Sequence, residues 1–205
     1  PADTPALSPA ALARCIPFLV FMAFLALRGY WPAGLGLDAR WVYGAQTVVV
    51  AGLLAGYWRG YGELARQNLP DARETGWAVV VGIAVFAIWI RLDAPWMQLG
   101  SATASIVPLD GDGRPIWTLI ALRLASAALV VPVMEELFWR SFLMRWAQQA
   151  SFERVDPQTV GLQAIVMSTF VFTLAHTLWL AAIVAGLAYA WLYRRSGKLW
   201  TAVIA

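Results

Sequence analysis

The chain has 205 residues, of which 60% are hydrophobic and only 13% are charged, and its mean hydropathy is +0.64. A soluble domain has about 45–50% apolar and about 25% charged residues, so this composition excludes an ordinary soluble domain and favours a membrane protein. The net charge of +3 comes from basic residues scattered between apolar blocks, which indicates no nucleic-acid partner. Cys15 is the sole cysteine, which excludes an internal disulfide and a cysteine-based metal site.

Three apolar blocks in the N-terminal half are predicted to cross the membrane as helices. The first lies between Arg14 and Arg28, and its 13 uncharged residues are few for a span, which takes about 20 apolar residues. The block can still cross the membrane if the side chains of both arginines extend to the membrane interface, or if the helix continues into residues 29–37. Residues 41–58 and 75–90 form the second and third predicted spans.

The C-terminal half follows a loop at residues 91–115 that is rich in proline and contains the turn sequence Asp-Gly-Asp-Gly. A fourth span is predicted over residues 115–134, and a polar, partly amphipathic stretch over residues 135–156. Residues 157–193 carry no formal charge over 37 positions, which is too long for one span at the rise of an α-helix. They are therefore predicted to form two spans with a tight turn near residues 176–179.

These elements predict an all-α fold, a multi-pass transmembrane helical bundle of about six complete spans plus a truncated seventh that begins at residue 199. We expect residues 1–205 to form a single membrane domain. If the N-terminus is cytoplasmic, the loops on that side carry ten basic residues and the opposite loops carry four. Basic residues gather on the cytoplasmic side, so this count predicts a cytoplasmic N-terminus.

Charged groups inside or beside a span are costly and are therefore functional candidates. The main cluster is Glu135-Glu136, followed by Arg140. On a helix, Glu136 and Arg140 are four residues apart and close enough to pair, whereas Glu135 points about 100° away and keeps no cation. A free carboxylate in a low-dielectric site can act as a general base toward water. The alternative interpretation is that both glutamates simply sit exposed at the cytoplasmic end of the fourth span.

The second candidate element is His176, the sole histidine, which lies in the most apolar stretch of the chain. Phe172 precedes it by one helical turn on the same face. A lone histidine on an apolar face is more often a hydrogen-bonded structural residue than a catalytic one. His176 gains weight because it needs a polar partner and the glutamate pair is the obvious source.

Other kinds of site find less support in the sequence. There is no H-E-x-x-H motif, which excludes a zincin-type site, and no G-x-S-x-G motif or phosphate-binding glycine loop. The carboxylates and His176 could hold a weakly bound divalent metal ion, with Glu135 and His176 as its ligands. The general-base mechanism needs no cofactor.

The motif E-E-x-x-x-R at Glu135, Glu136 and Arg140, followed by F-x-x-x-H at Phe172 and His176, resembles the CPBP family of intramembrane proteases. This family includes the type II CAAX prenyl endopeptidase-like and Abi-like proteins. The motif-bearing core covers about the last 90 residues, from residue 115 to residue 205. The N-terminal half resembles the CAAX-protease-related branch found beside bacterial exosortase systems.

The resemblance implies an intramembrane endopeptidase in which Glu135 and His176 activate the water that attacks the peptide carbonyl. Glu136 and Arg140 would orient and charge-balance the site, and Phe172 would pack beside the histidine. The family also has a third motif, a histidine followed four residues later by Asn or a similar residue, which stabilises the oxyanion. That motif should begin where this sequence stops, so we expect such a fragment to be nearly inactive and the core to be cut at the C-terminus.

The resemblance also implies membrane lipid and a peptide or protein substrate with a membrane-associated segment as partners, and the bacterial cytoplasmic membrane as the location. The sequence gives no indication of an oligomeric state. Two other classes of function stay open, namely a non-catalytic membrane scaffold or immunity-type protein with an incomplete site, and a small transporter. In a transporter, Arg123, Glu135 and His176 would line a polar path.

The predicted spans leave one conflict, because they place Glu135 near the cytoplasmic end of the fourth span and His176 near the far end of the fifth. The two side chains can meet if the fourth span continues past Arg140, or if the turn after His176 lies deep in the membrane.

Overall fold

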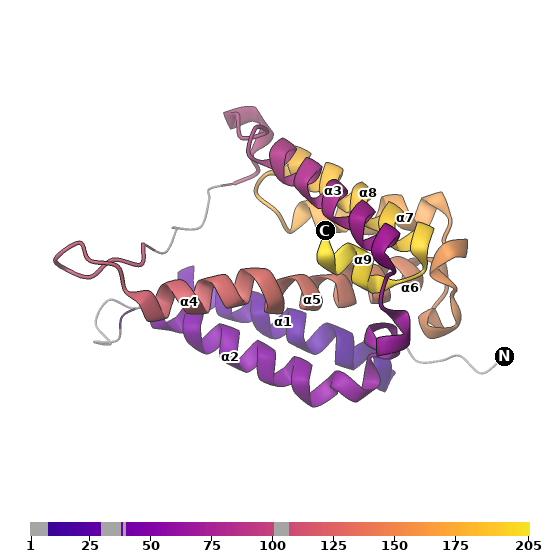
Figure 1. The fold of residues 1–205 in the computed structure, drawn as a ribbon, viewed down its shortest axis with the longest axis horizontal. Helices are drawn as coiled ribbons and strands as arrows, with labels where there is room; N and C mark the ends of the chain where they lie inside the picture. Colours follow the sequence, from indigo (N-terminus) through magenta and orange to yellow (C-terminus); the bar gives the residue numbers. More distant parts are fainter. Residues whose placement is uncertain (1–7, 30–37, 39, 101–106) are drawn as a thin grey trace.

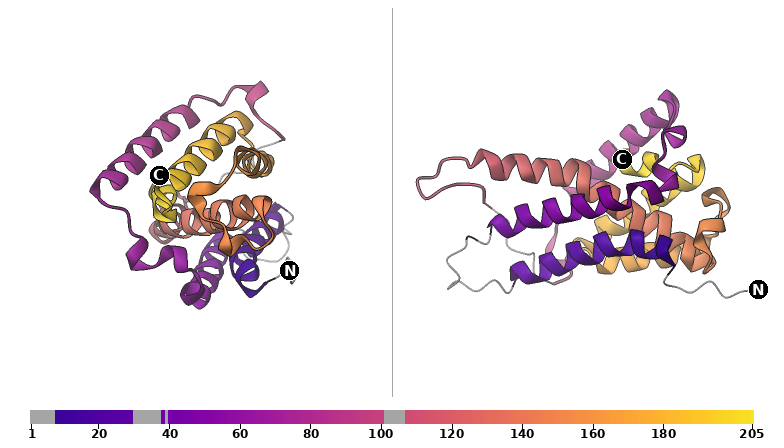
Figure 2. Two further views of the ribbon diagram at one scale, coloured as in Figure 1. Left: turned by 90° about the vertical axis from the view of Figure 1, so that its right-hand side faces the viewer. Right: turned by 90° about the horizontal axis from the view of Figure 1, so that it is seen from below.

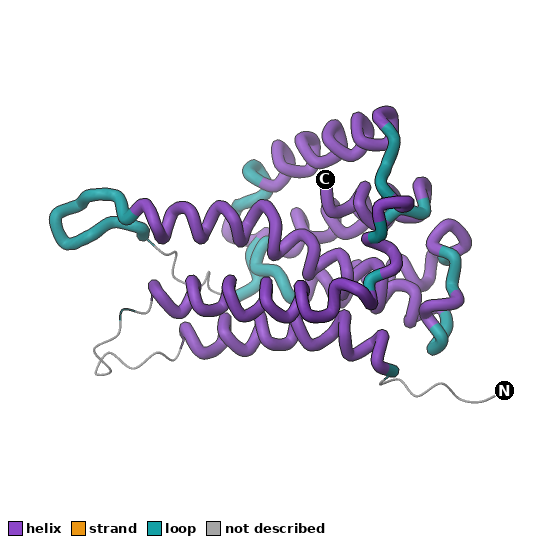
Figure 3. The backbone as a smooth tube through the Cα atoms, turned by 60° about the horizontal axis from the view of Figure 1, so that its bottom comes forward, coloured by secondary structure: helices purple, strands orange, loops and turns teal. Residues whose placement is uncertain are grey.

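The computed structural model describes residues 8–29, 38, 40–100 and 107–205, and these parts of the chain form helices and loops without a strand among them (Figure 3). The predicted all-α fold is confirmed. The α-helices are α1 (Pro9–Gly29), α2 (Arg40–Tyr57), α3 (Ala72–Trp89), α4 (Trp117–Ala125), α5 (Val131–Glu136), α6 (Arg145–Gln148), α7 (Leu162–Leu174), α8 (Trp179–Ser196) and α9 (Leu199–Ile204). The shorter helical segments are η2 (Trp58–Gly60), η3 (Gly62–Leu64), η4 (Arg66–Asn68), η5 (Pro95–Met97), η6 (Ser126–Val130), η7 (Leu137–Met144), η8 (Phe152–Arg154) and η9 (Pro157–Thr159).

The helices form two groups that share one long helical segment (Figure 1). In the first group α1 and α2 lie side by side and pack against the segment that begins with α4. In the second group α3 and α7 both pack against α8. The short helix α9 contacts α3, α8 and α5, so it joins the two groups near the centre of the molecule (Figure 2).

The long helical segment runs without interruption from Trp117 to Gln148, a length of 32 residues, through α4, η6, α5, η7 and α6. The predicted end of the fourth span at residue 134 is therefore wrong. The helix continues because most side chains of η7 are buried, in packing against α1 and α7. The extension past Arg140 is the first of the two arrangements that would let Glu135 meet His176.

Two widened, π-helical stretches lie within this continuous segment, η6 before α5 and η7 after it. Pro132 lies just after η6 and has no N–H to donate, and its ring would clash with the carbonyl four residues earlier in a regular helix. A widened turn relieves this clash. Consequently α5, which carries Glu135 and Glu136, lies between two π-helical turns, a feature that is frequent at functional sites.

The ends of α3 and α8 follow from local sequence signals. The side chain of Asp71 accepts a hydrogen bond from the backbone N–H of Glu74 at 2.8 Å, and the carboxylate of Glu74 accepts one from the N–H of Asp71 at 2.9 Å. This reciprocal cap starts α3. Gly197 ends α8 in the left-handed conformation, with φ of 70°, which glycine adopts without a steric cost.

Three helical stretches of the described chain are long and apolar enough to cross a membrane, namely Pro9–Arg28, Ala72–Trp89 and Trp117–Gln148. α2 and α8 have 18 residues each, but arginines at one end of each helix lower its mean hydropathy. α7 is apolar and shorter. The predicted count of about six complete spans is therefore not confirmed. The extension of the first span beyond Gly29 falls on residues 30–37, outside the described part of the chain.

A buried ionic cluster, which we call the Glu63 cluster, joins α1, η3 and η7. Arg14 donates two hydrogen bonds to the carboxylate of Glu63, at 2.8 and 2.7 Å, and the hydroxyl of Ser141 donates a third. The guanidinium of Arg145 lies 3.9 Å from the same carboxylate. Burial disfavours the ionised form of Glu63, but the hydrogen bonds and charge of Arg14 outweigh it, so the pKa of Glu63 lies below its ordinary value.

Candidate active site

Glu136 and Arg140 form a buried ion pair on the helical segment that begins with α5. An Nη1–Oε1 distance of 2.9 Å joins them, and their residues are only 4% and 2% exposed. The predicted pairing of these two side chains at a spacing of four residues is confirmed. Because both are removed from water, the pair has a fixed geometry rather than that of a mobile surface ion pair.

Glu135 lies on a different face of α5 from Glu136 and is half-buried. It forms no ion pair and no hydrogen bond with the described residues, as its orientation on the helix predicts. The guanidinium of Arg140 nevertheless lies close enough to interact electrostatically with Glu135, Glu136 and His176. One cation is thus shared between the glutamate pair and the histidine.

Phe172 connects the two motifs. Its ring lies beneath the guanidinium of Arg140, at 4.6 Å from the guanidinium carbon, and it contacts the ring of Trp139 edge-on at 5.4 Å. The centre of the His176 ring lies 4.2 Å from that of the Phe172 ring. The structure therefore brings the Glu-Glu-Arg motif and the Phe-His motif together through one aromatic ring, although they are far apart in the sequence.

His176 is hydrogen-bonded to the backbone of α7. The sequence had favoured the glutamate pair as its partner. Its Nδ1 lies 2.8 Å from the carbonyl oxygen of Phe172. A carbonyl can only accept, so Nδ1 carries the proton in the neutral ring and Nε2 keeps its lone pair. A neutral histidine in this tautomer can accept a proton or a hydrogen bond at Nε2.

The turn that carries His176 connects α7, which ends at Leu174, to α8, which begins at Trp179, so the predicted turn near residues 176–179 is confirmed. The end of α7 is closed by backbone hydrogen bonds from Ala175 and His176 to the preceding turn. A short turn is expected here because the uncharged run is too long for one helix.

A segment that follows α3, which we call the strap (residues 94–99), is attached to this turn. The N–H of Leu99 donates to the carbonyl of Thr177 at 2.7 Å, and the indole N–H of Trp179 donates to the carbonyl of Trp96 at 3.2 Å. Just before the strap, Trp89 meets the ring of His176 edge-on at 5.9 Å. Sequence reasoning missed this contact, because α3 and α7 are separated by more than 70 residues and only the fold places them together.

Tyr189 on α8 is a second residue of the site that sequence reasoning missed. Its ring lies 5.3 Å from the guanidinium of Arg140, and it interacts electrostatically with Glu135 and Glu136. One sequence signal could have found it. Tyr189 lies three residues after Gly186, so on a helix the two residues share a face, and Gly186 packs against α7.

Two buried polar atoms of the ion pair have no hydrogen-bond partner among the described residues, Oε2 of Glu136 and Nη2 of Arg140. Buried polar atoms are almost always hydrogen-bonded, so each such atom calls for a reason. Atoms left in this way beside a half-buried carboxylate and a histidine can bind a polar group of a substrate or a water molecule.

The alternative metal site receives no support from this arrangement. Within the described residues, no three side chains of the types His, Cys, Asp and Glu come together as a group that could hold a metal ion. Glu135 and His176 would supply two ligands at most, whereas a tightly bound catalytic metal usually has three protein ligands.

Comparison with known proteins gives one match. Residues 116–205 match the sequence model of the Rce1-like family, described as type II CAAX prenyl endopeptidase Rce1-like. No curated protein and no solved structure matches the chain. The matched residues contain the glutamate pair, Arg140, Phe172 and His176, and the narrower resemblance to the exosortase-associated branch stays a prediction. The part of the chain that builds this site, residues 116–205, is therefore similar to the Rce1-like type II CAAX prenyl endopeptidases.

Proposed function

We propose that this protein is an intramembrane endopeptidase that hydrolyses a peptide bond with a water molecule activated by Glu135 and His176. The observation that carries the proposal is the meeting of the two motifs around Arg140 and Phe172. The family match supports a peptidase of the CAAX type in a membrane. A substrate with a membrane-associated segment fits a site on long apolar helices.

In the proposed reaction Glu135 accepts a proton from water while the water oxygen attacks the peptide carbonyl carbon. The same proton then passes to the leaving amine nitrogen as the carbon–nitrogen bond breaks. His176 holds the water through Nε2, because its Nδ1 is engaged by the carbonyl of Phe172. Glu135 suits the role of base because it forms no ion pair with any residue that the structure describes, whereas Glu136 is paired with Arg140.

The remaining residues hold this geometry. Glu136 and Arg140 orient the site and supply a positive charge beside the developing oxyanion, and Phe172 fixes the ring of His176. The hydroxyl of Tyr189 is our candidate for an additional hydrogen-bond donor to the oxyanion. Donors of this kind each contribute about 2.7–4 kcal/mol in other hydrolases.

The test is cleavage of a farnesylated peptide with a C-A-A-X terminus, and of an unmodified membrane-anchored peptide, by the full-length protein in proteoliposomes. Glu135→Gln and His176→Ala are each expected to lower the rate by about 10²–10⁴-fold, because each removes one proton-transfer or hydrogen-bonding group. Glu153→Gln is the matched control, since Glu153 is an exposed glutamate on η8.

Thermal unfolding in detergent shows whether each variant is folded. If wild-type cleavage persists in both Glu135→Gln and His176→Ala, the proposed mechanism is wrong. If neither the wild type nor any variant cleaves, while the cellular phenotype survives both substitutions, a non-catalytic scaffold or immunity-type role replaces it. Flux of a small solute through the proteoliposomes would instead indicate a transporter.

We also propose that the N-terminus lies on the cytoplasmic side of a bacterial cytoplasmic membrane. Three loops that together hold six of the fifteen basic residues lie at the same end of the bundle as the start of α1 (Figure 1). They are residues 58–71, 149–161 and 194–198. A basic end facing the cytoplasm follows the distribution seen in membrane proteins generally.

A further inference from the structure

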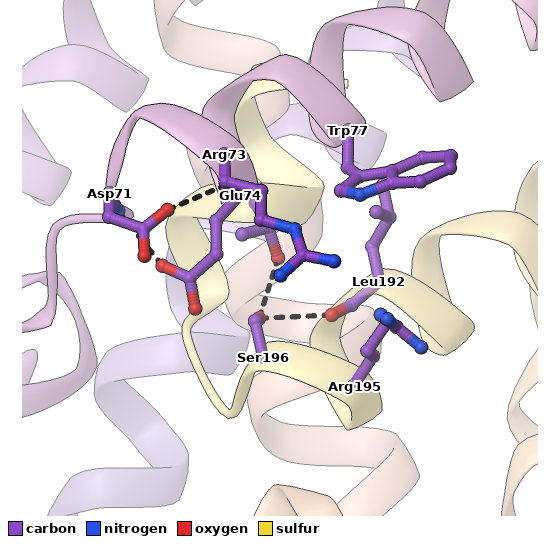
Figure 4. A pocket seen from close by; sticks show the side chains of 8 residues that line it. Asp71, Arg73, Glu74, Trp77, Leu192, Arg195 and Ser196 are labelled. Carbon is purple, nitrogen blue, oxygen red and sulfur yellow. Dashed lines mark hydrogen bonds between the residues drawn. The ribbon is translucent and has the colours of Figure 1, made fainter.

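A cavity of about 240 Å³ lies between the start of α3 and the end of α8, away from the glutamate pair (Figure 4). Its walls carry two arginines, one from each helix, together with polar and apolar side chains. In Figure 4 Arg73 extends from α3 and Arg195 from α8 into the space between the two helices. The lining residues are Asp71, Arg73, Glu74, Trp77, Leu192, Arg195, Ser196 and Thr201.

Together with Lys198, which pairs with Glu74, the cavity has three cationic groups against two carboxylates and so keeps a net positive charge. The carboxylate of Glu74 is paired with Lys198 at 2.7 Å and also caps the N–H of Asp71. The carboxylate of Asp71 accepts the N–H of Glu74 and closes the start of α3. Neither Arg73 nor Arg195 forms an ion pair within the described residues, and the guanidinium of Arg195 lies 5.6 Å from the ring of Trp191. Both guanidinium groups therefore keep donors for an anion.

The position of the cavity is that of a membrane interface. α3 is one of the three stretches able to cross a membrane, and it starts at the cavity. Trp77 lines the cavity and is 47% exposed, as is typical of tryptophan at the level of lipid headgroups. Leu192 gives the opposite wall an apolar surface. The cavity thus combines two guanidinium groups with the apolar side chains of Trp77 and Leu192.

We propose that this cavity binds the phosphate group of an anionic phospholipid, with Arg73 and Arg195 as its two cationic ligands. Basic pockets between membrane helices on the cytoplasmic side are suited to such headgroups. Each guanidinium group can donate two parallel hydrogen bonds to phosphate oxygens, and the net positive charge of the cavity favours an anionic headgroup over a zwitterionic one. A bound lipid would link α3 to α8, the helix that carries Tyr189 toward the catalytic site.

The test is native mass spectrometry of the full-length protein in detergent, with phosphatidylglycerol and phosphatidylcholine of the same chain length added in turn. The wild type is expected to retain phosphatidylglycerol at lower lipid concentration than phosphatidylcholine. Arg73→Gln and Arg195→Gln are each expected to weaken phosphatidylglycerol binding about fivefold, and the double variant about 25-fold. Arg73→Lys keeps the charge and should lose less than Arg73→Gln.

Arg66→Gln is the matched control, because it removes one exposed arginine from η4 at the same end of the molecule but outside the cavity. It should bind phosphatidylglycerol like the wild type, and the unfolding temperatures of all variants should agree. Equal binding by the wild type and the double variant would overturn the proposal. Displacement of the lipid by millimolar glycerol phosphate would assign the site to a soluble phosphate instead. Peptide cleavage is not part of the readout, so the result is independent of the proposed function.

Discussion

Among single residues, the buried ion pair of Glu136 and Arg140 is the main feature of the site. Glu136 and Arg140 are nearly inaccessible to water, and each keeps one terminal atom without a hydrogen-bond partner among the described residues. A buried ion pair adds little net stability, because the desolvation of two charges offsets their attraction. Removal of one partner is costly, since the other charge then stays buried alone. The pair is therefore expected to fix the geometry of the site rather than to stabilise the fold.

The replacement Arg140→Met tests this expectation. It leaves the carboxylate of Glu136 buried without a cation, and the free energy of unfolding should fall by about 3–5 kcal/mol. The double variant Glu136→Gln/Arg140→Met removes both charges and should recover most of that loss while it stays catalytically impaired. Denaturant unfolding in detergent measures both values. A double variant as unstable as Arg140→Met would contradict the interpretation.

The Glu63 cluster predicts a dependence of stability on pH. The pKa of Glu63 is lower in the folded protein than its ordinary value of 4.5, because Arg14 and Ser141 hold the carboxylate ionised against the effect of burial. A group with a depressed folded pKa stabilises the fold above its unfolded pKa, and this stability is lost as the pH falls through the folded pKa. The wild type should therefore unfold at a higher temperature than Glu63→Gln at pH 7.

Unfolding temperatures of the wild type and of Glu63→Gln, measured from pH 7 to pH 3, check this prediction. The difference between the two proteins should be constant down to about pH 5 and shrink below pH 4.5. Glu153→Gln, in which an exposed carboxylate is removed, should differ little from the wild type over the whole range. A difference that grows as the pH falls would rule out the proposed role of Glu63.

At the scale of helices, the contact between α7 and α8 positions the histidine. The small residues Ala182, Gly186 and Ala190 are buried and lie one turn apart along α8, which lets the two backbones approach closely. A Cβ atom at Gly186 would come within 2.8 Å of Thr169 and 3.3 Å of Phe172. Since the carbonyl of Phe172 accepts the hydrogen bond of His176, this close contact links helix packing to the position of the histidine.

The variant Gly186→Ala is accordingly expected to separate α7 from α8 and to lower the free energy of unfolding by about 1–3 kcal/mol. Its rate of cleavage should fall as well. Thr169→Ala removes the methyl group nearest to the new Cβ, so the double variant Gly186→Ala/Thr169→Ala should regain part of the stability. Gly52→Ala in α2 is the control, because a Cβ at that position would have no atom of another described helix or loop within 4 Å. A neutral effect of Gly186→Ala would show that α8 is not tightly packed there.

The whole molecule has two unlike ends. One end holds the start of α1, the segments η2 to η4 and the end of α8, and it is rich in arginine. The other end holds the turn of His176 and the loop that precedes α4 (Figure 1). Because the bilayer selects orientation through basic residues, this asymmetry predicts one orientation for the entire bundle.

Cysteine labelling on intact cells measures the orientation. In a Cys15→Ser background, Gln67→Cys lies at the basic end and Gly111→Cys at the opposite end, and both positions are exposed. A maleimide that cannot cross the membrane is expected to react with Gly111→Cys in intact cells and with Gln67→Cys only after lysis. The reverse pattern would place the N-terminus outside the cytoplasm.

The sequence alone determined the features that depend on local chemistry and on composition. The excess of apolar residues requires helices in a membrane, because only helices and closed barrels satisfy the backbone there. The spacing of four residues was sufficient to pair Glu136 with Arg140 and to place Phe172 beside His176. The length of the uncharged run also located the turn between α7 and α8, since no single helix of that length fits a bilayer.

Only the tertiary structure decided how distant segments meet. The fourth helix continues past residue 134 because η7 is covered by α1 and α7, and such cover cannot be read from residues 135–148 themselves. Trp89 and Tyr189 were not predicted as site residues, because each belongs to a helix that carries no motif and contacts the site only through the fold. Local periodicity fixes which residues share a helix face. Which faces come together depends on the packing of the whole bundle.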